Sequence, residues 1–112
     1  MELKRVVVTG LGAVTPLGLN VDETWEALLN GVSGAGPITH FDASQFKTQF
    51  ACEVKNFDPT LYLDKKEVRK FDRYAQFAVA AAKEAVGDSA LDLEKVDKNR
   101  VGVIFAAGIG GI

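Results

Sequence analysis

Two uninterrupted apolar runs lie near the ends of the chain, at residues 5–9 and 100–107. Both are rich in β-branched residues and lack the alternation of apolar and polar positions that indicates a strand with one solvated face. Strands covered on both faces are typical of parallel sheets. We therefore predict a buried strand in each run. The first leads to Gly10 and Gly12, and the second leads into the sequence GIGGI.

Between these runs, apolar positions first recur with helical spacing after Asn20. Asn20 is suited to cap a helix, Glu23 follows three residues later, and Gly31 follows the last turn. The apolar positions of this helix share one face, which we predict to be core. They are Val21, Trp25, Leu28 and Leu29.

Two more helices are predicted in the second half of the chain. Asp64 and Glu67 have the spacing of a capping box and open a short basic helix. A longer helix follows at about residues 72–86, and Gly87 ends it. Its many alanines would let it pack close to a neighbouring element.

The segments between the predicted elements are irregular. Residues 31–59 predict a long surface excursion with one short edge strand near residues 50–54, and residues 91–99 predict a charged surface connection. The order strand, helix, excursion, helix, strand indicates the α/β class. Two strands do not make an independent sheet of this kind. We therefore interpret residues 1–112 as the opening, incomplete part of a larger fold, and we expect this part alone to fold poorly.

The glycine-rich segment VVVTGLGAVTPLG raises the question of a dinucleotide site. The fingerprint G-x-G-x-x-G fails at Thr15, Pro16 removes an amide donor, and the helix begins only near Asn20. We predict instead a tight turn that lets the backbone approach its neighbours closely. A nucleotide-binding domain remains an alternative that saturable NAD binding would revive.

Composition narrows the function classes. The chain has 112 residues, 47% of them hydrophobic, and a net charge of −2, which fits a globular protein and gives no reason to expect nucleic acid. One cysteine and one histidine cannot form an internal disulfide or the usual zinc cluster. We expect no cofactor, no metal, no membrane span and no secretory signal, which is compatible with the cytoplasm.

Several stretches together resemble the amino terminus of the β-ketoacyl-acyl-carrier-protein synthases, most closely the synthase II type. They are RVVVTGLGAVTPLG, TWEALLNGVSG, ITHFD, KKEVRKFDRYAQFAVAAAKEA and VGVIFAAGIGG, in the family's order; the family often has GSGIGG where this chain has AAGIGG. The resemblance implies a thiolase-like fold of five layers, α-β-α-β-α, in a homodimeric cytoplasmic enzyme. It also implies decarboxylative Claisen condensation of an acyl chain with a malonyl-carrier thioester in fatty acid biosynthesis.

The family's catalytic cysteine and two histidines match no residue of this chain, so we expect no catalytic residue here and predict that the chain alone is inactive. Cys52, in FACEV, lacks the strand-to-helix setting of the nucleophile, and we predict a partly buried, inert thiol. His40, in PITHFD, matches a loop histidine of the family. We predict a surface or loop-bracing role for it, because no ionisable partner is evident.

The stretch DKKEVRKFDR holds the most informative local chemistry. Four of its five basic residues would share one face if the whole stretch were one helix: Lys66, Arg69, Lys70 and Arg73. The resemblance carries Lys66, Arg69 and Lys70 onto a patch that docks the acidic acyl carrier protein. The alternative is a basic face that is only solvated.

Gly108 and Ile109 form a second candidate site, again through the resemblance. The matching isoleucine of the family lies at the wall of the acyl-chain pocket and can act as a gate, supported by the glycines around it. The alternative is an ordinary core isoleucine. For the chain as a whole, the alternatives are a catalytically inactive synthase-like subunit and a carrier-protein interaction module.

Overall fold

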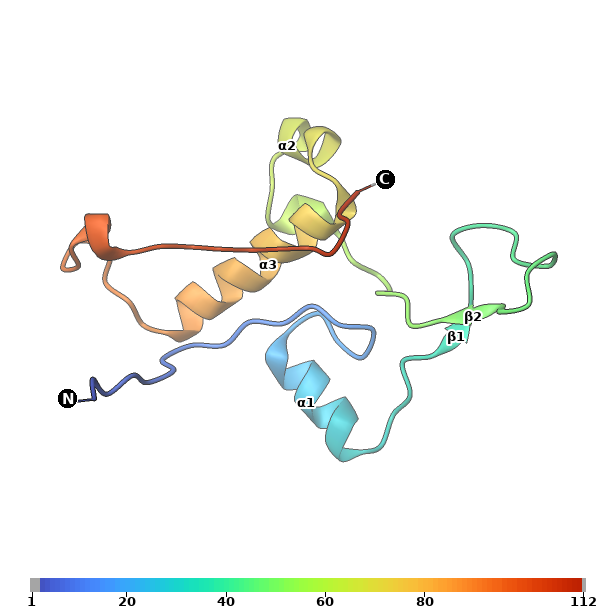
Figure 1. The fold of residues 1–112 in the computed structure, drawn as a ribbon, viewed down its shortest axis with the longest axis horizontal. Helices are drawn as coiled ribbons and strands as arrows, with labels where there is room; N and C mark the ends of the chain where they lie inside the picture. Colours follow the sequence, from blue (N-terminus) through green and yellow to red (C-terminus); the bar gives the residue numbers. More distant parts are fainter. Residues whose placement is uncertain (1–2, 112) are drawn as a thin grey trace. The chain divides into compact units, whose positions relative to one another are not determined.

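The computed structural model describes residues 3–111 of the chain (Figure 1). Its helices and strands, in chain order, are α1 (Val21–Leu29), β1 (Gly36–Pro37), β2 (Phe50–Ala51), α2 (Lys65–Lys70) and α3 (Arg73–Asp88). Short 3-10 turns η1 (Pro59–Leu61) and η2 (Lys98–Arg100) precede α2 and follow α3. The described residues divide into two compact units. The first takes its residues from Met1–Gly12 and Pro59–Ile112, and the second is Ala13–Asp58.

Helix α1 begins where the sequence predicts it. The Asn20 side chain accepts a hydrogen bond from the Glu23 amide at 2.8 Å, and the Glu23 carboxylate accepts one from the Leu19 amide at 2.8 Å. This reciprocal pair satisfies amides that the first helical turn leaves without partners. The predicted core face is wrong for the described residues. Trp25 is 60% exposed and Leu29 is 69% exposed, because no described element of the second unit covers them.

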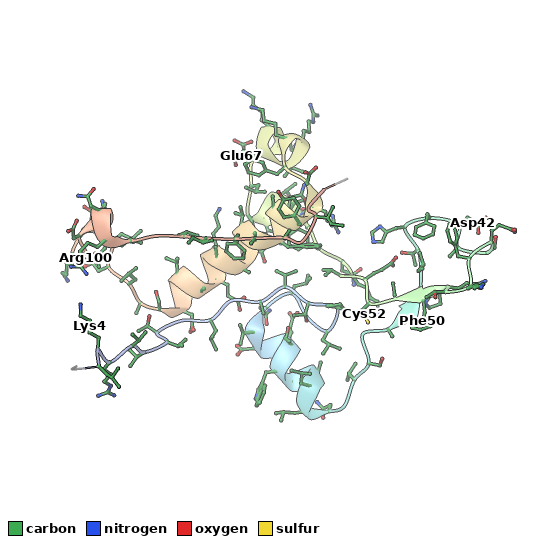
Figure 2. The ribbon with its side chains drawn as sticks, in the orientation of Figure 1. Lys4, Asp42, Phe50, Cys52, Glu67 and Arg100 are labelled. Atoms are coloured by element: carbon green, nitrogen blue, oxygen red, sulfur yellow. The ribbon has the colours of Figure 1, made fainter. Side chains whose placement is uncertain are left out.

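The excursion after α1 contains a two-stranded antiparallel sheet. Gly36 pairs with Ala51 and Pro37 with Phe50, which confirms the short strand predicted near residues 50–54. The loop from residue 38 to 49 closes between these strands, and its tip contains Asp42 (Figure 2). The Phe41 and Phe46 rings contact edge to face, 5.6 Å between centroids. The excursion is therefore ordered by its own side chains.

The glycines of the first unit allow very close packing on α3. A Cβ atom on Gly10 would collide with the Ala85 carbonyl oxygen, and one on Gly12 would collide with that of Ala81. The predictions of a close backbone approach and of an alanine-rich contact face are both confirmed. The Leu11 amide donates to the Asp88 carboxylate at 2.9 Å. This amide is thus engaged by an acid, which would repel a pyrophosphate.

The two predicted buried strands are not strands among residues 3–111. Residues 5–9 and 101–107 are not part of any ladder, and Val6 and Ile104 are 89% and 94% exposed. A strand that is apolar on both faces needs neighbouring strands to pair with its backbone and helices to cover its two faces. Residues 3–111 do not provide these neighbours, so the two segments remain unpaired. Figure 1 shows residues 101–107 as an extended trace.

Both extended segments run along α3 in the same direction. The first passes Ala85 at Gly10 and Ala81 at Gly12. The second leaves the connection that follows α3 and reaches the helix N-terminal end. A Cβ on Gly110, where φ is +83°, would lie 3.2 Å from the Tyr74 ring. This is the relative direction of two parallel strands joined by a helical crossover.

Few side chains are buried within the described chain. The buried apolar residues are Ala43, Phe57, Leu63 and Ala80. Leu63 and Ala80 lie in the first unit, one directly before α2 and the other in the middle of α3. The largest apolar runs are therefore outside the core, and the buried residues of the first unit lie just before α2 and within α3.

Candidate functional site

Helix α2 owes its start to a complete capping box. The Asp64 carboxylate accepts hydrogen bonds from the amides of Lys66 and Glu67, both at 2.8 Å. In return, the Glu67 carboxylate accepts one from the Asp64 amide at 3.2 Å. Figure 2 labels Glu67 on this short helix. Six residues are too few for an isolated helix, so the cap and the surrounding contacts decide whether it forms.

The three predicted docking residues lie on α2 and are exposed: Lys66, Arg69 and Lys70. Among residues 3–111, none of the three forms an ion pair. Val68, in contrast, is partly buried and anchors the opposite side of the helix. The structure therefore brings together three solvated positive charges on a helix whose other side faces the protein. Such a surface favours an acidic partner.

Arg73 does not belong to this group, contrary to the single-helix interpretation. The backbone is extended at Phe71 and Asp72, so α2 ends at Lys70 and a new helix begins at Arg73. The Arg73 guanidinium lies over the Phe77 ring, 5.2 Å from its centroid. Arg73 thus makes a cation–π contact within α3.

The second candidate site lies at the end of the described chain. Ile109 is 79% exposed, and a Cβ on Gly108 would meet no neighbouring atom. The two glycines that follow are packed against the start of α3, Gly110 beside Tyr74 and Gly111 beside Asp72. Neither the acyl-pocket interpretation nor the core alternative is decided by this exposure, because the whole preceding segment is equally uncovered. The role of Ile109 as an acyl gate remains a prediction.

His40 and Cys52 have different surroundings from those expected. His40 Nε2 lies 3.7 Å from Glu53 Oε1, so the histidine does have an ionisable neighbour. Hydrogen bonds from the side chain and amide of Thr39 hold the pKa of Glu53 below its ordinary value. These bonds join the start of the excursion loop to the segment after β2. The predicted bracing of the loop thus exists, and its anchor is Glu53.

Cys52 is exposed rather than partly buried (Figure 2). It borders a shallow apolar hollow of the second unit that is also lined by Pro16, Leu17, Leu28 and Val32. No basic residue lines this hollow to stabilise a thiolate, so the setting does not activate the sulfur.

Metal sites and membrane spans are two further kinds of feature, and the described part of the chain has neither. Within residues 3–111, no three acidic, histidine or cysteine side chains come together as metal ligands. None of the helices there has both the length and the apolar character needed to span a bilayer.

Sequence reasoning missed Gln76, which is the buried polar residue of the first unit, 7% exposed. Its side-chain nitrogen donates to the carbonyl oxygens of Val68 at 3.0 Å and Phe71 at 2.9 Å. A signal was present, because Gln76 lies four residues before the buried Ala80 and so interrupts the apolar face of α3. A polar residue on such a face needs partners.

Comparison with known proteins identifies the family. Residues 3–112 match the model of the β-ketoacyl synthase N-terminal domain, and the chain belongs to this family. It is 54% identical over all 112 residues to the 3-oxoacyl-[acyl-carrier-protein] synthase 2 of Coxiella burnetii, and 46% identical to that of Synechocystis sp.. In both cases the chain spans 27% of the relative's length. The resemblance seen in the sequence is confirmed.

Solved structures agree. The chain is similar to the ishigamide ketosynthase/chain length factor, with a TM-score of 0.72 at 39% identity over 80% of this chain and 22% of that one. It is also similar to a type II polyketide ketosynthase solved with its acyl-carrier protein, with a TM-score of 0.62 at 26% identity over 88% of this chain and 24% of that one. The α/β, thiolase-like fold class is therefore confirmed.

Proposed function

We propose that this chain is the amino-terminal part of a β-ketoacyl-acyl-carrier-protein synthase, and that α2 is a docking surface for the acyl carrier protein. The identity of 54% with a synthase 2 over the whole chain supports the activity. The exposed Lys66, Arg69 and Lys70 on a capped helix support the docking surface. A carrier protein is also the partner in one of the similar structures.

In the proposed reaction, a cysteine thiolate takes the acyl group from its carrier and releases the carrier thiolate. Loss of carbon dioxide from the malonyl-carrier thioester leaves an enolate, which attacks the acyl thioester. Collapse of the adduct returns the cysteine thiolate and gives a β-ketoacyl product two carbons longer. Thiolates suit this step because they are strong nucleophiles and good leaving groups. Two histidines stabilise the developing negative charge.

We assign that cysteine and those histidines to the part of the synthase that corresponds to the uncovered length of the relatives. The complete enzyme is proposed to be a cytoplasmic homodimer that needs no cofactor. The contribution of residues 1–112 is then recognition: α2 receives the carrier, and Gly108 and Ile109 border the acyl pocket. Electrostatic attraction of an acidic carrier raises the encounter rate more than it strengthens the final complex.

The test reverses the charge of Lys66 and Arg69 together in the complete protein. Lys66→Glu with Arg69→Glu should raise the KM for carrier-bound substrates roughly tenfold, because two attractions become repulsions at the docking surface. The KM for a carrier-free acyl thioester should not change. The matched control is Lys47→Glu with Lys55→Glu, which changes the net charge equally on exposed residues of the second unit. If both double variants behave alike, α2 is not the docking surface.

A second candidate is a catalytically inactive synthase-like subunit. It is favoured by the similarity to a ketosynthase/chain length factor structure, because a chain length factor accompanies a ketosynthase. Incubating the complete protein with an acyl-carrier substrate decides between the two. A thioester-linked acyl group found on the protein by mass spectrometry supports the synthase, and its absence supports the inactive subunit.

A further inference from the structure

Gln76 joins α3 to α2 at the corner between the two helices. It lies four residues inside α3 and is 7% exposed, whereas most glutamines of folded proteins are solvated. Its backbone amide donates to the Asp72 carbonyl at 3.0 Å, as a residue of the helix should. Its side chain, in contrast, binds outside the helix: both of its described hydrogen bonds go to backbone carbonyls that precede α3.

The two acceptors of Gln76 are carbonyls that the end of α2 leaves without helical partners. The Phe71 amide closes the last helical bond, to the Glu67 carbonyl at 2.9 Å. The backbone then turns extended, so no later amide of α2 reaches the carbonyl of Val68. Gln76 Nε2 donates one hydrogen to Val68 and the other to Phe71. One side chain therefore provides hydrogen bonds to both free carbonyl groups at the C-terminal end of α2.

The orientation of the Gln76 amide follows from these acceptors. Reversing it would place its oxygen against two carbonyl oxygens. In the observed orientation Oε1 is buried and accepts no hydrogen bond from the described residues. The stabilisation that this side chain supplies comes from its two donated bonds. A purely apolar side chain of the same size would fill the space but leave both carbonyls unpaired.

Helix α3 also contacts the segment that leads into the N-terminus of α2. The Lys83 ammonium, from the middle of α3, donates to the Tyr62 carbonyl two residues before the N-cap Asp64. Leu63, between them, is buried. Gln76 is thus the buried half of a two-point attachment that fixes α2 on α3.

We infer that Gln76 is a positioning residue for carrier recognition: by holding the carbonyls of Val68 and Phe71, it fixes the direction in which Lys66, Arg69 and Lys70 face the carrier. This inference rests on the proposed docking function of α2. Gln76 does not touch the carrier or the reacting groups. A loosened α2 would keep its charges but present them over many orientations, which lowers the affinity for one partner geometry.

The test compares Gln76→Met with Ala80→Gly in the complete protein. Methionine has nearly the size of glutamine but donates no hydrogen bond. Ala80→Gly weakens α3 at a buried position without removing a bond to α2.

Gln76→Met should speed hydrogen exchange of the α2 amides roughly tenfold, and it should raise the KM for carrier-bound substrates roughly fivefold. The kcat and the KM for a carrier-free thioester should not change. Ala80→Gly should leave the α2 exchange and the carrier KM near their original values.

The outcomes separate the inference from the proposed function. If charge reversal at Lys66 and Arg69 raises the carrier KM but Gln76→Met does not, the inference is overturned and the docking function stands. If charge reversal has no effect, the docking function and the link from Gln76 to recognition both fall. Unchanged exchange of α2 in Gln76→Met overturns the attachment itself. Should Gln76→Met not fold, Gln76→Asn, one methylene short of both carbonyls, is expected to show the same selective rise in KM.

Discussion

Gly12 lies so close to α3 that any side chain there would meet the Ala81 carbonyl, and Gly10 stands in the same relation to Ala85. Neither glycine has the positive φ that would require glycine for conformational reasons. Glycine is needed at both positions for lack of space, because the backbone of residues 10–12 packs directly against the alanine-rich side of α3. The glycine-rich sequence is thereby explained by packing.

Gly12→Ala should lower the free energy of unfolding of the complete protein by about 1–3 kcal/mol, since the extra methyl group must displace backbone rather than a flexible side chain. Chemical denaturation measures the change. Gly36→Ala is the matched control, because Gly36 lies in β1 outside the predicted buried strands and a Cβ there meets no neighbouring atom. Equal losses in the two variants would argue against close packing as the reason for glycine.

At the scale of single residues, sequence could predict what local chemistry determines. A close backbone approach at Gly10 and Gly12 was predictable from the glycines, and close packing of α3 from its alanines, but that the two meet is seen only in the structure. The partner of His40 was not, because Glu53 is brought to it only by the pairing of β1 with β2. The role of Gln76 depends in the same way on where the chain turns between α2 and α3.

Among the elements, α2 shows how much a cap contributes to a short helix. Its start was predictable because Asp64 and Glu67 lie three residues apart, and the observed bonds are those of a capping box. Its end was not predictable from composition, since the run of basic residues continues through Arg73 while the helix stops at Lys70. The carbonyls at this end accept hydrogen bonds from Gln76, which comes later in the chain.

Asp64→Ala should destabilise α2 by about 0.5–2 kcal/mol, because two helix amides lose their acceptor. Hydrogen exchange of the amides of Lys66 and Glu67 measures it. Asp72→Ala is the natural comparison, since Asp72 is the N-cap residue of α3 but makes no side-chain capping bond. A larger effect at Asp72 than at Asp64 would contradict this account of capping.

The two predicted buried strands do not form among residues 3–111. Residues 5–9 and 100–107 have the composition of buried strands, and their shared direction along α3 suits a parallel pair. A β-ladder, however, requires hydrogen bonds between two neighbouring strands, so one segment cannot form it alone. Helices satisfy their own backbone, which is why α1, α2 and α3 are present near their predicted bounds.

For the molecule as a whole, charge is unevenly distributed. The chain carries a net charge of −2, yet α2 holds four basic residues and one acidic residue. An acidic partner would therefore be attracted to one helix and not to the rest of the surface. The α/β class and the family could be predicted from the sequence, because the motifs extend along all 112 residues.

The KM of the complete protein for carrier-bound substrates should rise with salt, by roughly threefold between 50 and 200 mM, because ions screen the attraction between exposed charges. Steady-state kinetics at several salt concentrations measure this dependence. The slope should flatten in the Lys66→Glu, Arg69→Glu variant and persist in the Lys47→Glu, Lys55→Glu control. An equal slope in all three proteins would place the electrostatic recognition elsewhere.

The contact of Gly10 and Gly12 with α3 also has a consequence for biosynthesis. The ribosome releases these glycines about seventy residues before Ala81 and Ala85. At the usual rate of translation that interval is roughly 4–15 s. During this time the backbone of residues 10–12 has no helix to pack against. The close contact at Gly10 and Gly12 therefore forms only after α3 has been synthesised, so this part of the first unit cannot assemble in the order of its sequence.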